Sequence, residues 1–320
     1  MTPERLALGD AVRGLLDRHS DVRAAIETPH GYDKDVWARL CEMGVLPIPE
    51  RYGGSGATHE DTRVVLAELG RTLTPSPLLG TTVAVEALLA SGDEEACGRL
   101  LPRIAGGAVA ALVWPWTDEQ IGLTARYVLD GDLADILLVS DGTDLHEVDL
   151  ASVTREHTPT MDATRRLATI DLTAAATTRL GLWSPHVRWT AIAALAAEQV
   201  GAAARALELT VEYTKTRVQF GKPIGSFQAL KHRMADLHVL VETARSAAGA
   251  VTDEVSASVA KVYCSEAFFT VAAEMIQLHG GIAITWEHDA HLYFKRAHGS
   301  RQLFGSPRVH LERLSHTAHR

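Results

Sequence analysis

The sequence predicts a mainly α-helical protein with a helical N-terminal domain, a small β middle domain and a C-terminal four-helix bundle. Helix-type spacing of apolar residues, with capping signals, fills the first third of the chain and returns near Ser184. Short apolar or alternating runs, separated by Asp-Gly turns, lie between these two helical parts. The expected domains are residues 1–107, 108–184 and 185–320.

Composition and charge narrow the classes of protein. Hydrophobic residues make up 46% of the chain, which is enough for a sizeable core, and the net charge of -9 argues against a nucleic-acid-binding surface. Cys41, Cys97 and Cys264 are far apart without metal-ligand spacing, as in proteins of the reducing cytosol. Met1–Asp10 lacks the apolar region of a signal peptide, and no apolar run approaches the length of a membrane span. We therefore expect a cytoplasmic protein without membrane or nucleic-acid partners.

The fifteen histidines raise the question of a metal site. Most stand alone, and His310, His316 and His319 near the C-terminus lack carboxylate or Cys partners at ligand spacing. We expect no metal.

Capping residues mark helix starts in the N-terminal part. Thr2 before Pro3 is an expected N-cap, Asp33 begins a second helix, and Thr58 with Asp61 resembles a capping box. The helices expected along the whole chain are residues 3–17, 33–44, 59–73, 78–90, 94–104, 185–216, 228–250, 256–278 and 289–298.

The middle of the chain is expected to form strands. Turns such as Asp130-Gly131 separate the runs, and Trp114-Pro115-Trp116 is either a binding surface or packing at a strand end. The expected strands are residues 109–114, 123–129, 136–139 and 167–172.

The turn between two long helical patterns, Arg217–Gln228, carries most of the functional information. Arg217 is suited to a bidentate contact with phosphate, and Phe220 offers a ring face to another aromatic group. Gln228 begins the next helix, where the helix dipole favours anions. Together these groups suit a nucleotide diphosphate. The alternative is a helix hairpin in which Arg217 pairs with a neighbouring carboxylate.

A second candidate site closes a long helix at Gln277, Gly280 and Gly281. The two glycines are explained by a helix C-cap and the turn beyond it. A glycine pair also lets the backbone approach a ligand closely, so the segment gains weight beside the first site.

With these segments, the chain resembles the acyl-CoA dehydrogenase family over essentially its whole length. The resemblance is strongest in residues 43–54, 217–228 and 277–296, which include an Arg-x-x-Phe-Gly and a Gln-x-x-Gly-Gly motif. It implies the family's fold, an acyl-CoA substrate and FAD as cofactor. The electron acceptor that it implies is an electron-transferring flavoprotein.

The resemblance also assigns cofactor-binding residues, because family members use both motifs to hold the diphosphate and adenosine part of FAD. That FAD is bound mainly by a neighbouring subunit, so an oligomer is implied. The residues of this chain that match are Arg217, Phe220, Gln228, Gln277, Gly280 and Gly281.

The catalytic base of the family is absent at both of its usual positions. In the family reaction, a Glu carboxylate removes the α-proton of the acyl-CoA while hydride passes from the β-carbon to the flavin. The stretch after the last bundle helix is Leu303–Ser306, without a carboxylate, and counting back from Gly221 places Ala191 at the other position. Glu198 lies two turns further along, and Glu287 matches a family Glu that is usually structural. We assign no catalytic residue.

The middle domain is also shortened relative to the family. The Thr-Glu-Pro-x-x-Gly-Ser-Asp loop, which helps to hold flavin and substrate, has no counterpart between Trp116 and Leu123. The family's Trp-Ile-Thr-Asn-Gly strand is matched by Tyr127–Gly131, without the Thr. This pattern resembles the α2β2 subgroup that holds one FAD per heterodimer and often acts on bulky sterol-derived CoA thioesters.

The prediction is therefore a subunit that completes the FAD site of a second, full-length acyl-CoA dehydrogenase and lacks its own catalytic Glu. One alternative is a homo-oligomeric dehydrogenase with an atypical base such as Glu198. Another is a non-catalytic flavin-binding or scaffold homologue.

Overall fold

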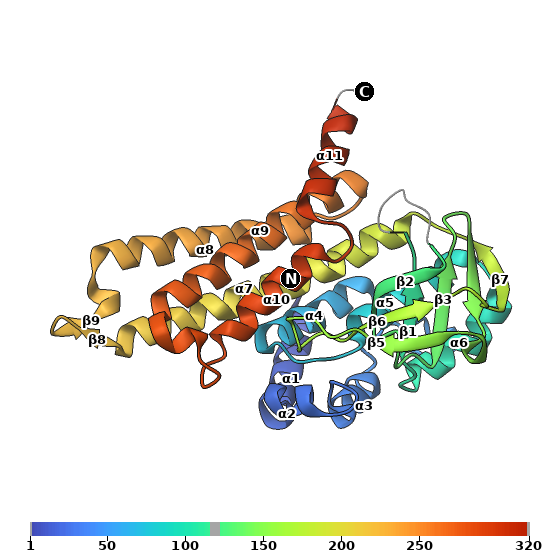
Figure 1. Ribbon diagram of the computed structural model, residues 1–320, viewed down its shortest axis with the longest axis horizontal. Coiled ribbons are helices and arrows are strands. Elements are labelled where there is room, and N and C mark those ends of the chain that lie inside the picture. The colour runs from blue at the N-terminus through green and yellow to red at the C-terminus, as the bar shows by residue number, and fades with distance from the viewer. Residues whose placement is uncertain (1, 116–121, 319–320) are drawn as a thin grey trace.

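The computed structural model describes residues 2–115 and 122–318. In Figure 1, long helices form a bundle on one side of the molecule, the strands gather at the other end, and the first helices lie against both. The order of helical, β and helical parts along the chain confirms the predicted fold class. The domain boundaries at residues 107 and 184 stay predictions.

The N-terminal part begins with the predicted caps. Thr2 Oγ1 accepts a hydrogen bond from the backbone N–H of Arg5, and Thr58 with Asp61 forms the predicted capping box. Both satisfy backbone donors that a helix start leaves unpaired. The short second helix escaped prediction because six residues show no clear period. The helices here are α1 (Pro3–His19), α2 (Val22–Glu27), α3 (Lys34–Glu42), α4 (His59–Thr72), α5 (Leu78–Ser91) and α6 (Glu94–Ala105), with a 3-10 turn at Glu50–Tyr52.

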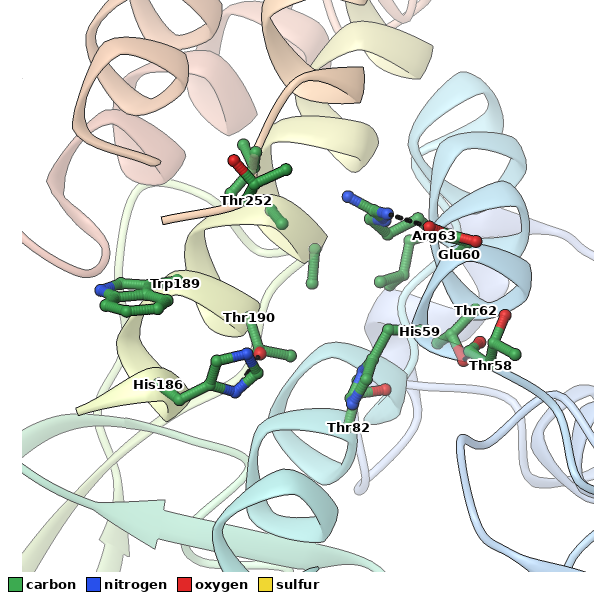
Figure 2. Close-up of a pocket in the computed structure, with 14 residues that line it drawn as sticks. Thr58, His59, Glu60, Thr62, Arg63, Thr82, His186, Trp189, Thr190 and Thr252 are labelled. Atoms are coloured by element: carbon green, nitrogen blue, oxygen red, sulfur yellow. Dashed lines mark hydrogen bonds and ion pairs between the residues drawn. The ribbon is translucent and has the colours of Figure 1, made fainter. Parts of the chain in front are cut away.

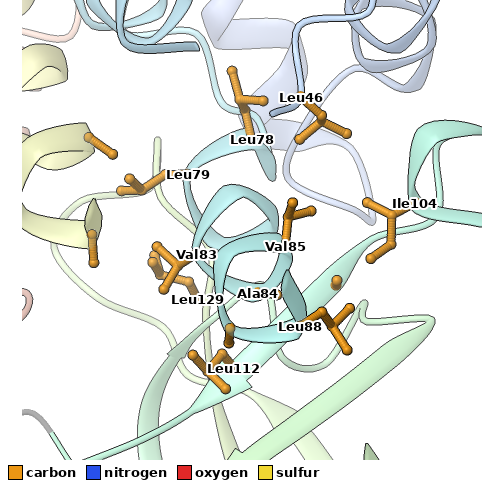
Figure 3. Close-up of a cluster of buried hydrophobic side chains, with 14 of the residues drawn as sticks. Leu46, Leu78, Leu79, Val83, Ala84, Val85, Leu88, Ile104, Leu112 and Leu129 are labelled. Atoms are coloured by element: carbon orange, nitrogen blue, oxygen red, sulfur yellow. The ribbon is translucent and has the colours of Figure 1, made fainter. Parts of the chain in front are cut away.

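Helix α5 is the core of this part. Every residue from Leu78 to Leu88 is buried, and Figure 3 shows its side chains pointing outward on several sides, toward Leu46, Ile104 and Leu112. A helix that is apolar all round is typical of a core position. Since Leu112 belongs to a strand, α5 also attaches the N-terminal helices to the β part.

The middle part contains two sheets. One has the strand order β1-β3-β4-β7, with β1 parallel to β3, and the other has the order β2-β6-β5 with antiparallel pairs. Apolar side chains from both sheets, such as Leu137 and Ile170, share one small core. The strands are β1 (Ala110–Val113), β2 (Thr124–Leu129), β3 (Ile136–Ser140), β4 (Asp144–Val148), β5 (Thr154–His157), β6 (Leu167–Asp171) and β7 (Thr177–Leu182), with a 3-10 turn at Leu150–Ser152.

The C-terminal part contains one helix more than the sequence predicts. Helix α11 has few apolar residues, and it packs against α9 while pointing away from the bundle (Figure 1). The elements are α7 (His186–Thr216), the hairpin β8 (Val218–Gln219) and β9 (Lys222–Pro223), α8 (Gln228–Gly249), α9 (Glu254–His279), α10 (Ala290–Gln302) and α11 (Pro307–Ala318), with 3-10 turns at Ile224–Ser226 and Gly280–Ile284.

Helix α9 with its following turn, Glu254–Ile284, is the one candidate among the described residues that is long and apolar enough to cross a membrane. It packs against α7, α8, α10 and α11. The face that it buries there includes the polar residues Lys261 and Ser265. These contacts are those of a core helix in a bundle.

Helices α4 and α7 cross at two glycines. A Cβ atom on Gly201 would lie 1.9 Å from the carbonyl oxygen of Ala67, and one on Gly70 would lie 2.1 Å from that of Glu198. Neither distance is possible for real atoms, so the two backbones touch only because both residues lack a side chain. This crossing fixes α7 against the N-terminal helices.

We expect Gly201→Ala to destabilise the protein by about 3 kcal/mol or more, because the added methyl group must push two backbones apart. Urea unfolding followed by circular dichroism measures the change. The control is Gly98→Ala in α6, where a Cβ meets nothing within 4 Å. That change should stabilise by up to about 1 kcal/mol. Equal effects of the two substitutions would contradict the close crossing.

Candidate functional site

The turn after α7 presents Arg217 and Phe220 to solvent. Arg217 is the C-cap of α7, it is exposed, and no described side chain forms an ion pair with it. Phe220 lies at the tip of the β8–β9 hairpin with 92% of its surface exposed. Its φ of +53° is uncommon for a bulky residue, so the hairpin holds the ring outward at some conformational cost.

Gln228 is the first residue of α8, and this helix start is open. Its N-cap residue, Phe227, provides no side-chain hydrogen bond to the first backbone N–H groups. Gln228 is exposed, with its amide 3.3 Å from His232. Unpaired N–H groups and the positive end of the helix dipole favour an anion at this place.

The second motif lies in the turn between α9 and α10. Gly280 adopts a φ of +66°, and neither Gly280 nor Gly281 has any atom within 4 Å of an added Cβ. Gln277 is exposed one turn earlier. The backbone at this turn is therefore open to a close approach from outside.

The two motifs lie at the same end of the bundle (Figure 1). Tyr213, one turn before Arg217, donates a hydrogen bond to the carbonyl oxygen of His279 (3.2 Å), and the two rings stack at 4.3 Å. Arg233 and Glu274 form an ion pair between α8 and α9. Large apolar side chains on this end are also exposed, which is typical of an interaction surface. They are Val218, Phe220, Ile282, Ile284 and Trp286.

The segment Leu303–Ser306, for which the resemblance predicts the family's base position, is buried except at Ser306, and hydrogen bonds hold it and the end of α10 before it. Phe304 is 3% exposed, with φ +58°, and Gly305 has φ +91°. His310 Nε2 donates to the carbonyl oxygen of Phe304 (2.9 Å), which leaves Nδ1 to accept from the hydroxyl of Ser258 (3.1 Å). Burial lowers the pKa of His310 to about 4, so the ring is neutral near pH 7.

A buried lysine holds the start of the same segment. Lys261 is 1% exposed, and its Nζ donates to the carbonyl oxygens of Ser300 (3.0 Å) and Arg301 (3.1 Å) at the end of α10. These are carbonyls that the helix end leaves without partners. Burial lowers the pKa of Lys261 to about 7.

Aromatic rings fill the space beside this segment. Phe304 packs against Trp114, with ring centroids 5.6 Å apart, and Trp114 packs against Trp183 at 5.8 Å. The cavity that remains between Phe304, Trp114 and Leu129 measures about 10 Å³, roughly the room of one water molecule. For Trp114 the structure therefore shows packing; Trp116 lies outside the described residues.

Neither acidic residue near the bundle is placed as a base. Glu198 is buried and forms ion pairs with Arg165 and Arg296. Burial alone would raise its pKa, but the two arginine charges outweigh that effect and lower it. Ala191 is fully buried, and Glu287 is exposed on the surface. Glu198 is thus an ionised carboxylate within a buried ion-pair network.

Asp130 lies beside the arginines that hold Glu198. It is 6% exposed and has a φ of +51°. Burial raises its pKa to about 7, more than the Arg165 charge lowers it. The carboxyl group therefore keeps a proton in the folded protein at a pH where the unfolded chain has lost it.

In the described ranges, 2–115 and 122–318, no group of three or more His, Cys, Asp or Glu side chains is arranged to hold a metal ion. His310 is fully buried, whereas His316 is exposed. His319 and the shortened loop before Leu123 lie outside the described ranges.

The chain belongs to the acyl-CoA dehydrogenase family. The family's N-terminal domain matches residues 2–108, and its C-terminal domain matches residues 193–318. Members of this family bind FAD.

The relatives include two proteins of nearly the same length. The acyl-CoA dehydrogenases IpdE2 of Mycolicibacterium smegmatis and of Mycobacterium tuberculosis are each 48% identical to this chain, and each match covers 98% of both chains. Among solved structures, a G363A variant of the Tcur3481–Tcur3483 steroid acyl-CoA dehydrogenase superposes with a TM-score of 0.87 and 29% identity, over 98% of this chain and 97% of that one. The ChsE4–ChsE5 complex of Mycobacterium tuberculosis has the same fold, with a TM-score of 0.87 and 24% identity over 100% and 98% of the two chains.

Sequence reasoning missed the residues that hold the segment Leu303–Ser306 in place. Lys261, Ser258 and His310 carry no motif, because their partners are backbone or hydroxyl groups on other helices. Trp183 and Trp114 are far apart in the sequence, so their contact could not be predicted from a motif. The Leu303–Ser306 stretch was the one signal, since it showed an apolar residue where the family has an acid.

The raised pKa of Asp130 gives a pH dependence with a definite sign. The folded protein holds this proton up to about pH 7, whereas the unfolded carboxyl loses it near pH 4, so stability falls between these values as pH rises. Asp130→Asn removes the effect and suits the left-handed backbone. The free energy of unfolding of the variant, relative to that of the wild type, should therefore rise by about 1 kcal/mol per pH unit between pH 5 and 7. Thermal unfolding at each pH measures this difference.

The control is Asp171→Asn. Asp171 is fully exposed, and hydrogen bonds from Thr173 lower its pKa. Its contribution is therefore constant above pH 5, and its difference from wild type should not change with pH. A pH-independent difference for Asp130→Asn as well would contradict the buried, protonated carboxyl.

Proposed function

We propose that this chain is a subunit of an FAD-dependent acyl-CoA dehydrogenase that completes the FAD site of a partner subunit and leaves the catalytic Glu to that partner. The reaction is the α,β-desaturation of an acyl-CoA thioester. The observation that carries the proposal is a contrast between two places in the chain. The two turns that would contact FAD are exposed to solvent, whereas the position matched to the family's base is filled by buried side chains.

The packing at Leu303–Ser306 supports the proposal that this chain lacks its own catalytic base. Phe304 and Gly305 stand where the family has a carboxylate, and the rings of Trp114 and Trp183 occupy the adjoining space. His310 lies 3.0 Å from a Cβ added at Gly305, so a larger residue would displace it. A carboxylate introduced here would be buried beside the rings of Phe304 and Trp114, which is costly.

The open turns fit the diphosphate and adenosine part of FAD. Arg217 offers a guanidinium with no described ion pair, and the start of α8 beside Gln228 offers backbone N–H groups to phosphate oxygens. Phe220 presents a ring to an aromatic base, and Gly280 with Gly281 admits the ligand close to the backbone. The bound FAD would supply the acceptor for the hydride that leaves the β-carbon.

The proposal extends to partner, substrate class and place. The partner is a second, full-length acyl-CoA dehydrogenase chain in an α2β2 assembly, because the exposed apolar end of the bundle needs a cover and the structural relatives include heteromeric enzymes. The substrate is an acyl-CoA with a bulky, steroid-derived acyl group, as the name of the Tcur3481–Tcur3483 enzyme suggests. An electron-transferring flavoprotein in the cytoplasm would accept the electrons.

Flavin content tests the division of labour. We expect the chain purified alone to hold little FAD and to show no turnover, and the co-expressed pair with the correct full-length dehydrogenase to hold about one FAD per heterodimer. Visible absorbance and size-exclusion chromatography measure both. Stoichiometric FAD on a homo-oligomer of this chain would overturn the proposal in favour of an atypical base. A flavin-bearing pair without turnover would favour a scaffold role.

Arg217→Ala should lower the FAD retained by the purified complex at least tenfold, because it removes a charged contact with the diphosphate. The matched control is Arg245→Ala, another exposed arginine on the bundle, which contacts only Glu242 within its own helix. Equal flavin content in the two variants would contradict the placement of the cofactor at the α7–α8 turn.

A further inference from the structure

A second cavity lies on the other side of α5 from the closed base position. It opens between the start of α4, the start of α7 and the turn that joins α8 to α9, and measures about 330 Å³ (Figure 2). That is the size of a small-molecule site. Its lining shares no residue with the small cavity beside Phe304: Thr82 of α5 faces it, whereas Gly80 and Val83 face the other.

The floor of this cavity includes two histidines, His59 and His186, which hold a buried carboxylate between them. Glu86 Oε2 lies 2.6 Å from His59 Nε2, and Glu86 Oε1 lies 2.7 Å from His186 Nδ1. His59 and His186 are the first residues of α4 and α7, so helix starts place them on either side of α5. Each imidazole donates one N–H to the carboxylate, which compensates the charge of Glu86. The second ring nitrogen, Nδ1 of His59 and Nε2 of His186, is not part of the hydrogen bond to Glu86.

A hydroxyl in the same floor has no partner. Thr82 is 1% exposed, and its Oγ1 makes no hydrogen bond within the described part of the chain. A buried hydroxyl without a partner costs free energy unless a ligand or water satisfies it. Since Thr82 lines the cavity, an occupant with an acceptor atom would meet that need.

Opposite the floor, a cation and an apolar wall define what fits. Arg63 lies across the cavity from Trp189 (Figure 2), and its nearest carboxylate is the exposed Glu60 at a long 3.7 Å. Leu66, Ala193 and Val251 give the remaining wall its hydrocarbon surface. The cavity thus offers a guanidinium that has one long ion pair among the described residues, and apolar side chains lie beside it.

We propose that this cavity binds a small carboxylic acid with a hydrocarbon body. The carboxylate would pair with Arg63, the hydrocarbon would cover Trp189 and Leu66, and a hydroxyl oxygen at the far end of the hydrocarbon would accept the hydrogen bond of Thr82. An amine is disfavoured because Glu86 is already held by two histidines, and a phosphate is disfavoured because Arg63 is the one arginine or lysine among the described residues of the lining and stands beside apolar side chains. The proposal does not depend on the division of labour between subunits proposed above.

Isothermal titration calorimetry on the full-length chain, in the assembly in which it purifies, tests the proposal with two probes. Cyclohexylacetate is the acid, and 2-cyclohexylethanol is its neutral counterpart. We expect the acid to bind at least tenfold more tightly than the alcohol. Arg63→Met should remove that preference while keeping the hydrocarbon contact, and Arg308→Met, at an exposed arginine on α11, should leave it unchanged.

Thr82→Val separates binding from folding. Removal of an unpaired buried hydroxyl should raise the melting temperature. A third probe, trans-4-hydroxycyclohexylacetate, adds a hydroxyl at the far end from the carboxylate. It should bind the wild type at least threefold more tightly than cyclohexylacetate, and Thr82→Val should remove that gain. A purely structural threonine would change stability alone. Equal affinity for acid and alcohol in the wild type, a retained preference in Arg63→Met, or a gain from the added hydroxyl that persists in Thr82→Val would each overturn the proposal.

Discussion

The buried ion pairs around Glu198 are the interaction on which the arrangement of the three parts depends. Glu198 comes from α7, Arg296 from α10, and Arg165 with Asp162 from the middle part. Each charge is out of water. Loss of Glu198 would leave Arg165 buried without this ion pair, and loss of Arg296 would do the same to Asp162, at a cost of about 3–5 kcal/mol. Glu198 also lies where α4 and α7 touch, so the network and the glycine crossing fix the same turn of α7.

This fixed frame has two ends of different character. At one end, the segment Leu303–Ser306 and the end of α10 before it are held by hydrogen bonds from His310 and Lys261 on neighbouring helices. At the other end, Arg217 and Phe220 extend from the bundle toward solvent. The polar contacts within this chain are thus concentrated at the buried end, and the exposed end leaves a charged and an aromatic side chain available for contacts outside the chain.

Sequence reasoning predicts the elements of this protein that are determined by residues close together in the chain. The apolar period predicts α7 and α9, and the capping residues Thr2 and Thr58 mark helix starts correctly. Strands β4, β5 and β7 were missed because their residues are largely polar, and only neighbouring strands make them extended. The partners of Glu198 and the rings around Phe304 could not be predicted, since they meet through contacts between residues far apart in the chain.

The exposure of Phe220 has a consequence for the life of the chain in the cell. A ring that is 92% exposed, at the same end of the bundle as the exposed Ile284 and Trp286, is a surface through which copies of the same protein can associate. If the partner subunit carries the cofactor, the supply of the two polypeptides has to be balanced. Synthesis of both from one messenger RNA would meet this need, because a newly made subunit would then find its cover close by.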